Sequence, residues 1–224
     1  MRMKVVFLMG IGSLLLSSPV IADGPADAGA ERTQVEGFDN WAWRDNPVSP
    51  GTLTCPGGEL VFDPFGMPYC ANSPTGRLNI RDSVLWACVT SPAEPRMTGV
   101  GIFSVNANLA ADSSGPVWGK WKIVPMENCD KDGLFPADLV MAATRYWRGS
   151  WQGKRLFYGD MIVPFWVGDL KLIGKGKGGN LEGLRFKGTE LITTYTPFPL
   201  PYEALGIPEL FDAPEGIISG TIKE

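Results

Sequence analysis

The chain contains no histidine, and this absence limits the chemistry it can perform. Without an imidazole, Ser-His-Asp and Cys-His catalysis, histidine metal sites and the usual general base near neutral pH are excluded. No CxxC pair accompanies the four cysteines, so a zinc site is disfavoured, and we expect neither a metal nor a cofactor. The remaining candidates for chemistry are carboxylates, Tyr, Lys, Asn and Arg.

Two carboxylates flank the segment after a glycine-rich turn. Glu182 and Glu190 are eight positions apart, which places them on one face of a regular strand. Their backbones would be about 26 Å apart, whereas glycoside hydrolysis needs two carboxylates about 5–9.5 Å apart. The pair therefore cannot act together, but Glu190 alone is a candidate acid in a ligand site. A solvated strand carboxylate is the favoured interpretation, because Glu is seldom buried.

Two amides, Asn106 and Asn108, share a face of an expected strand because they are two positions apart. If they face the interior of a barrel, they could orient a polar ligand or stabilise an oxyanion. Asn is also common where strands give way to turns, and residues 110–112 have the composition of a turn. We therefore favour a structural polar pair and keep the ligand site as the alternative.

Tryptophan supplies a second set of candidates, of which Trp118, Trp147 and Trp151 could line an apolar or sugar-stacking site. Core packing is the favoured interpretation, since buried indoles contribute much apolar area. Trp118 and Trp121 are three positions apart and face opposite sides of a regular strand, so at least one should lie outside the main core. Trp147 and Trp151 are four apart and share a face.

Lys175 and Lys177 lie in a glycine-rich loop that superficially resembles a phosphate-binding loop. A P-loop requires GxxxxGK[ST] between a strand and a helix. Here Gly178, Gly179 and Asn180 follow, and then another strand pattern. The loop therefore predicts a hairpin turn.

Short alternating segments separated by turns are typical of an all-β fold. The chain has 28 Gly and 19 Pro, and it contains no long segment of helical periodicity. We predict a single antiparallel β-barrel of about eight strands over residues 33–224, after a flexible segment 23–32. The last strand would let the sheet close on its first. The expected strands are 59–62, 77–89, 97–109, 116–124, 140–152, 156–158, 162–173, 181–195 and 217–222.

A long Pro-rich loop, residues 197–214, interrupts this pattern near the C-terminus. The only helix that we expect is a short one within it, at residues 201–205. Because the loop also carries many apolar residues, we expect it to cover one mouth of the barrel or to present a contact surface.

The N-terminus has the layout of a cleavable signal peptide. Arg2 and Lys4 precede an apolar run that is too short to span a bilayer, and residues 20–22 end on Ala22, which suits signal peptidase. We therefore expect residues 1–22 to be removed and the mature protein to be exported, periplasmic or extracellular, without a membrane span. Its formal charge of −4 is too weak and mixed to imply nucleic acid or an anionic membrane as a partner.

In an exported protein an even number of cysteines predicts disulfides. Three pairings of the four cysteines are possible, and we favour Cys55–Cys70 and Cys88–Cys129. The first closes a short loop rich in Gly and Pro, and the second ties a strand to the end of a later strand.

A weak repeat places Trp close to Gly and a basic residue, at residues 118–122, 147–155 and 166–171. A Gly opposite a neighbouring Trp makes room for the indole. The strings at 115–119, 147–153 and 174–186 resemble exported bacterial proteins of uncharacterised function and, more distantly, the allene oxide cyclase and plant dirigent barrel superfamily. The resemblance covers residues 97–195. It implies an antiparallel barrel with a possible apolar cavity, and it assigns no catalytic residue.

Three functions remain open at this point. The first is an exported, non-catalytic β-barrel that binds a small apolar ligand or a partner, and its oligomeric state is undetermined. The second is a cofactor-free isomerase, cyclase or lyase acting through Tyr, Asn and a carboxylate. The third is a carbohydrate-binding module with exposed Trp. A cavity with one buried acid beside Asn or Tyr favours the second, and coplanar Trp side chains on an outer face favour the third. An interior fully packed with aliphatic and Trp side chains favours a structural role.

Overall fold

We analysed a computed structural model of the chain. The expected leader, most of the segment after it and the Pro-rich loop with its short helix lie outside the described residues. The structure describes residues 32–41, 48–62, 68–112, 114–130, 134–158, 165–195 and 216–224.

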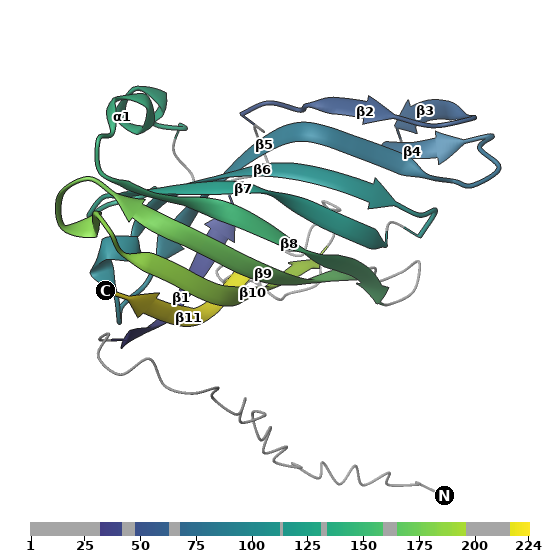
Figure 1. The fold of residues 1–224 in the computed structure, drawn as a ribbon. Helices are drawn as coiled ribbons and strands as arrows, with labels where there is room; N and C mark the ends of the chain where they lie inside the picture. The colour runs from purple at the N-terminus through teal and green to yellow at the C-terminus, as the bar shows by residue number, and fades with distance from the viewer. Residues whose placement is uncertain are drawn as a thin grey trace, which may run out of the picture. The chain divides into compact units, whose positions relative to one another are not determined.

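The described chain is all-β and is dominated by one nine-stranded antiparallel sheet (Figure 1). From β5 to β10 each strand pairs with the next along the chain, so the spatial order follows the sequence. A separate hairpin, β3–β4, joins Glu59–Phe62 to Pro68–Ala71. The strands of the main sheet are β1 Arg32–Trp41, β2 Thr52–Thr54, β5 Leu78–Thr90, β6 Gly99–Leu109, β7 Gly115–Pro125, β8 Tyr146–Tyr158, β9 Phe165–Lys177, β10 Arg185–Tyr195 and β11 Gly216–Lys223.

The first and last strands of the sheet lie side by side. β1 pairs with β11 from Arg32 to Asp39, and its end pairs with β5 from Phe38 to Trp41. The last strand therefore pairs with the first strand of the structure, as in the predicted closure, but that strand is β1, which was not expected as a strand. The first expected strand, 59–62, forms the separate hairpin with β4 instead.

The region between β7 and β8 differs from the prediction. A strand was expected from residue 140, but Ala137–Ala142 forms the short helix α1 and β8 begins at Tyr146. Ala, Leu and Met are strong helix formers, and their local preference outweighs the single β-branched Val140. β8 then continues without a break to Tyr158, where two separate strands were expected.

The two faces of the sheet carry separate hydrophobic clusters. We call the face that packs the larger cluster the inner face and the opposite one the outer face. Strand alternation sends every second residue to the inner face, which explains the regular apolar pattern. The inner cluster is Val35, Leu78, Ala87, Val89, Met97, Phe103, Ala107, Leu109, Val117, Trp121, Ile123, Trp147, Trp151, Leu170, Leu172, Leu181, Leu184, Phe186, Ile218 and Ile222.

Glycines give the largest inner side chains their space. Trp121, Gly149, Gly174 and Phe186 are successive Cα partners on β7 to β10. The indole of Trp121 lies over both glycines and meets the ring of Phe186 edge-on, with centroids 5.9 Å apart. The expected role of Gly opposite a neighbouring Trp is confirmed.

The smaller cluster lies on the outer face of β5–β7, under the segment that contains α1. Val140 of α1 is buried there with Trp86, Val100 and Val124. The ring of Phe135 lies 5.8 Å from that of Trp86. Both favoured disulfides are present: Cys88–Cys129 fastens this segment to β5, and Cys55–Cys70 links the chain after β2 to β4. Two disulfides indicate an oxidising compartment.

Candidate functional site

The predicted site residues separate between the two faces of the sheet. Asn106 and Asn108 lie on the outer face of β6, because their neighbour Ala107 is buried on the inner one. Asn108 Oδ1 accepts a hydrogen bond from Arg81 Nη2 (2.6 Å), and Asn106 Oδ1 accepts one from the Asp82 amide (3.1 Å). Both amides therefore hold the β-bulge of β5, where Asp82 has a φ of 53°.

The tryptophans divide as their spacing predicted. Trp121 is buried on the inner face, while Trp118 lies on the outer face with the Arg81 guanidinium 5.2 Å from its ring. Trp147 and Trp151 share the inner face, and both are buried. The Trp147 indole donates to the carbonyl of Arg96 (2.8 Å), which fixes it in the core.

The expectation of a solvated Glu190 is wrong. Glu190 is only 1% exposed and faces inward, between Gly188 and Ile192 on β10. It does not share a face with Glu182, because β10 begins at Arg185 and Glu182 lies in the turn before it. Strand alternation starts only after that turn, so counting from Glu182 carried no information about Glu190.

Glu190 belongs to a small polar group on the inner face. Trp151 and Arg155 lie on the same face of β8, two strands away across β9. Burial lowers the pKa of the Arg155 guanidinium to about 10, which still leaves it charged at neutral pH. The Trp151 Nε1–H is buried and finds no hydrogen-bond acceptor among the described residues. A buried donor without an acceptor is unusual in a folded protein.

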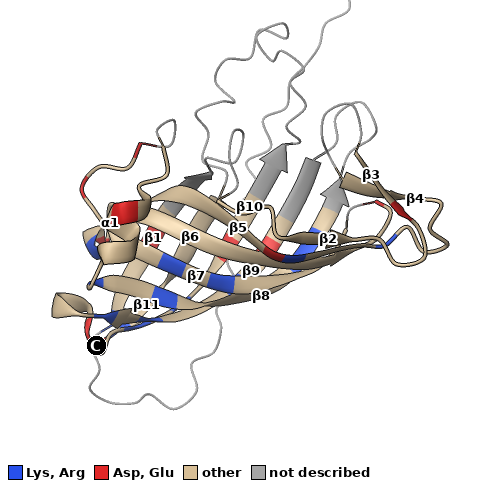
Figure 2. Cartoon of the chain, turned by 90° about the horizontal axis from the view of Figure 1, so that it is seen from above, with Lys and Arg blue, Asp and Glu red and all other residues tan. Residues whose placement is uncertain are grey.

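The outer face of β7 to β11 has a different character, because its charged side chains are almost all basic. Figure 2 shows where the Lys and Arg residues lie along the strands. Among the described residues of these strands, Asp169 is the only acid that faces outward. The outward-facing cations are Lys120, Lys122, Arg148, Lys154, Lys171, Lys175, Lys177, Arg185, Lys187 and Lys223.

Five of these cations, together with Arg32 of β1, form an unbroken row perpendicular to the strands. Each member is the Cα partner of the next, so neighbouring backbones are about 5 Å apart. Like charges directly opposite one another destabilise a sheet by up to about 1 kcal/mol a pair. Six adjacent strands contribute one cation each, in the order Lys122, Arg148, Lys175, Arg185, Lys223 and Arg32. We call these residues the cationic row.

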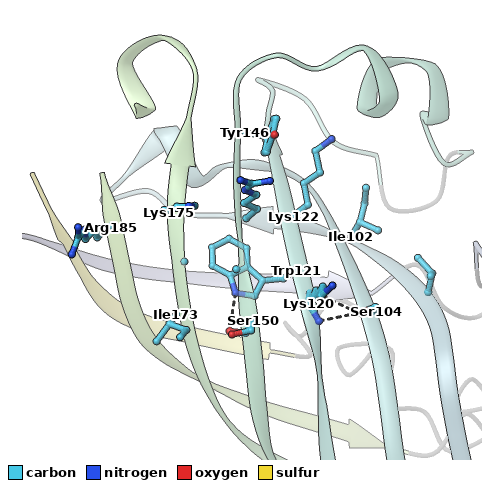
Figure 3. Close-up of a pocket in the computed structure, with 14 residues that line it drawn as sticks. Ile102, Ser104, Lys120, Trp121, Lys122, Tyr146, Ser150, Ile173, Lys175 and Arg185 are labelled. Carbon is cyan, nitrogen blue, oxygen red and sulfur yellow. Dashed lines mark hydrogen bonds between the residues drawn. The ribbon is translucent and has the colours of Figure 1, made fainter. Parts of the chain in front are cut away.

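An open groove of about 950 Å³ follows the cationic row on the outer face (Figure 3). Its lining includes five cations and no acid. The backbone at Gly149 and Gly174 forms part of its floor, and Ile173, 57% exposed, lies between the cations. The cations of the lining are Lys120, Lys122, Arg148, Lys175 and Arg185.

Lys122 forms the end of the groove nearest α1. Its Nζ donates to the carbonyl of Val140 (3.0 Å) and lies 4.6 Å from the centroid of the Tyr146 ring. Partial burial lowers the pKa of the Lys122 ammonium. Within the described chain, Lys120, Arg148, Lys175 and Arg185 make no ion pair with an acid. These four cations are therefore available to an anionic ligand.

The predicted hairpin turn is present but begins later than expected, because residues 174–177 continue β9 and Lys175 and Lys177 lie on that strand. The turn includes the 3₁₀ helix η2, Gly179–Leu181, and connects β9 directly to β10. Glu182 accepts a hydrogen bond from the Gly178 amide (2.7 Å) and lies 3.3 Å from Lys177 Nζ, and both contacts lower the pKa of its carboxyl group. The turn shows no strand-to-helix geometry of the kind a P-loop needs.

Sequence reasoning missed the cationic row, although a signal was present. Basic residues recur at every second position in 120–122, 175–177 and 185–187, which is the strand period, and Lys171 lies four positions before Lys175 on the same face. The alternation predicts that they share a face within each strand. It does not supply the register that aligns Arg148 with Lys122 on one side and Lys175 on the other.

Comparison with known proteins gives no relative: no family model, no curated protein and no solved structure matches the chain. In the part of the chain that the structure describes, no helix has the length and apolarity needed to cross a membrane. The described residues also contain no group of three or more Cys, Asp or Glu placed to hold a metal ion.

Proposed function

We propose that this protein is an exported, non-catalytic binding protein that takes an anionic partner into the groove on its outer face. The cationic row carries this proposal. A sheet with five successive like-charged neighbours gives up stability that opposite charges in the same positions would supply. An anionic partner converts this repulsion into attraction.

The scaffold that we infer for the row is a closed eight-stranded barrel formed by β1 and β5 to β11. The pairing of β1 with both β11 and β5 supports this inference, because it leaves none of these eight strands at an edge. Closure would hold the six cations at fixed spacing. The two disulfides and the leader-like N-terminus support export to an oxidising compartment. The resemblance to the allene oxide cyclase and dirigent barrels remains a prediction.

Binding to long-chain inorganic polyphosphate, measured at several salt concentrations, tests the proposed function. The test variant is Arg148→Gln with Lys175→Gln. The matched control is Lys154→Gln with Lys171→Gln, which removes the same charge from the outer face of the same two strands but outside the groove. Each neutralised contact should reduce the dependence of log affinity on log salt by roughly one.

We expect the groove variant to lose more than tenfold in affinity and the control less than threefold. Equal losses for the two variants would show that binding follows net charge rather than the groove. Absence of binding by the unmodified protein at low salt would refute an anion-binding function altogether.

A second candidate function uses the inner face and retains the small-ligand and cofactor-free enzyme hypotheses. The buried Trp151 Nε1–H without an acceptor favours it, because a ligand carbonyl or ether oxygen there would complete the hydrogen bond. Native mass spectrometry of protein purified from its own host tests this candidate. A co-purified small molecule that is lost in Trp151→Phe would support it, and a bare protein mass would contradict it.

The carbohydrate-binding hypothesis receives less support from the geometry. Trp121, Trp147 and Trp151 are buried on the inner face. On the outer face of the described strands, Trp118 lies under Arg81 and Trp86 lies under the α1 segment. No pair of exposed Trp rings is available there for stacking on sugars.

A further inference from the structure

The segment around α1 exposes three large apolar side chains that the anion-binding groove does not explain. Leu134 is 90%, Leu139 64% and Met141 82% exposed. Soluble proteins expose apolar side chains singly without consequence, but three within one short segment indicate a contact surface.

The segment that carries these exposed apolar side chains is anchored to the sheet. Val140, between Leu139 and Met141, is buried against the outer face of the sheet, and Phe135 packs against Trp86. The Cys88–Cys129 disulfide fastens the start of the segment to β5. With the buried Val140 facing the sheet, its neighbours Leu139 and Met141 remain exposed to solvent.

The α1 segment and the groove adjoin each other. Lys122, which lines the groove, donates to the carbonyl of Val140 in α1, and Ile173 adds an exposed apolar side chain among the cations. Both the α1 segment and the groove lie on the outer face of the sheet. A partner that enters the groove from solvent therefore meets apolar and cationic side chains together.

We propose that this combined surface docks the protein onto an anionic lipid bilayer, an inference that rests on the proposed anion-binding function. Leu139 and Met141 would enter the interfacial region of the bilayer. Arg148, Lys175 and Arg185 would contact lipid phosphates. A surface that joins exposed Leu and Met to Lys and Arg has the two components that hold peripheral proteins at anionic membranes.

Charge and aromatic content favour a bilayer over a soluble polymer. A polyanion in solution would use the cations and leave Leu139 and Met141 in water. Binding of single-stranded nucleic acid also calls for aromatic platforms on which bases stack. In the described groove, Tyr146 lies beneath Lys122, and the Trp121 ring belongs to the inner core. Two acids border the surface: Asp138 on α1, and Glu182, which is paired with Lys177.

Vesicle co-sedimentation of the full mature protein tests the inference, with phosphatidylcholine vesicles that contain or lack phosphatidylglycerol. The test variant is Leu139→Ser with Met141→Ser. The matched control is Leu156→Ser with Leu191→Ser, two exposed apolar residues on the outer face outside the groove and α1. Polyphosphate binding is measured for every variant, since it reports an intact groove.

We expect binding only to the anionic vesicles, with at least a tenfold loss for the α1 variant and less than twofold for the control. Arg148→Gln with Lys175→Gln should lose about 25-fold, or roughly fivefold for each charge. Polyphosphate affinity of the α1 variant should remain unchanged.

The outcomes separate the two proposals. Membrane docking is refuted, and anion binding stands, if the protein binds polyphosphate but not anionic vesicles. The same conclusion follows if the α1 variant binds the vesicles as tightly as the unmodified protein. If neither probe binds, both proposals fail.

Discussion

Gly174 offers the sharpest test of how the inner core is built. Its Cα partners place it between Gly149 and Phe186, directly under the indole of Trp121. A Cβ added at Gly174 would lie only 2.6 Å from Cη2 of Trp121, and it would lie still closer to Cζ2 of the same ring. Carbon atoms prefer a separation of about 3.5–4.0 Å. Gly174→Ala therefore requires the indole to move by roughly 1 Å.

The cost of that movement follows from the packing. Overfilling a well-packed core costs about 1–3 kcal/mol. We expect the upper end, about 3 kcal/mol, because Phe186 blocks the indole on its far side. Gly168→Ala is the matched control, since Gly168 lies on the same face of the same strand and the nearest atom to an added Cβ is 3.6 Å away. Replacing Gly without a clash stabilises by up to about 1 kcal/mol through the unfolded chain.

Urea unfolding followed by tryptophan fluorescence, with the disulfides intact, measures the free energy of unfolding for each variant. A double-mutant cycle with Trp121→Leu isolates the contact. In that background Gly174→Ala should cost only about 1 kcal/mol, which remains because the added Cβ still lies 2.9 Å from the backbone carbonyl oxygen of Arg148. Trp121→Leu itself is strongly destabilising. The reasoning is refuted if Gly174→Ala costs the same in both backgrounds, or if it matches Gly168→Ala.

Three further predictions concern an ion pair, a disulfide and a hydrogen bond that stabilise the sheet. Glu94→Gln should lower the free energy of unfolding at pH 7 by about 1.5–3 kcal/mol, because it weakens the buried charge-assisted contact with Arg96. The Arg96 guanidinium lowers the pKa of the Glu94 carboxyl group, so this contribution is present at neutral pH. In acid titrations the stability difference from the unmodified protein should vanish as pH falls through that lowered pKa. Replacing Cys88 and Cys129 together by Ser should cost about 4 kcal/mol by the loop-entropy estimate for a sequence separation of 41, measured by thermal unfolding, and no loss would show that the α1 segment holds without the bond. Asn108→Ala should cost about 1 kcal/mol in urea, since Arg81 keeps two backbone acceptors, and a loss above about 3 kcal/mol would contradict this limited role.

The strands could be predicted because alternation is a local property. Residues 97–109 and 116–124 were assigned almost to their ends, and the disulfide pairing followed from loop composition and strand order. α1 was missed because six residues are too few to show helical periodicity. β1 was missed because its pairing partners are the last strand and β5, both distant in sequence.

Burial of single polar residues was harder to predict than strand positions. Glu190 was expected in solvent because Glu is rarely buried. The average burial of a residue type is a poor guide to any single residue. Its inward orientation depends on where β10 begins after the turn at Gly179–Leu181. A shift of one residue in that start would have placed Glu190 outside and Leu191 inside.

The cationic row shows why total charge is a weak guide to partners in a β protein. The net charge of −4 was taken as too weak and mixed to imply an anionic partner, yet ten basic residues lie on one face of five neighbouring strands. Alternation sorts charges between faces within each strand, and antiparallel register then aligns them between strands. Sorting alone would give scattered cations; alignment gives Lys122, Arg148, Lys175 and Arg185 at about 5 Å steps along a single groove. Charge should therefore be counted for each face of a sheet once register is known, because a partner meets one face and not the average of the chain.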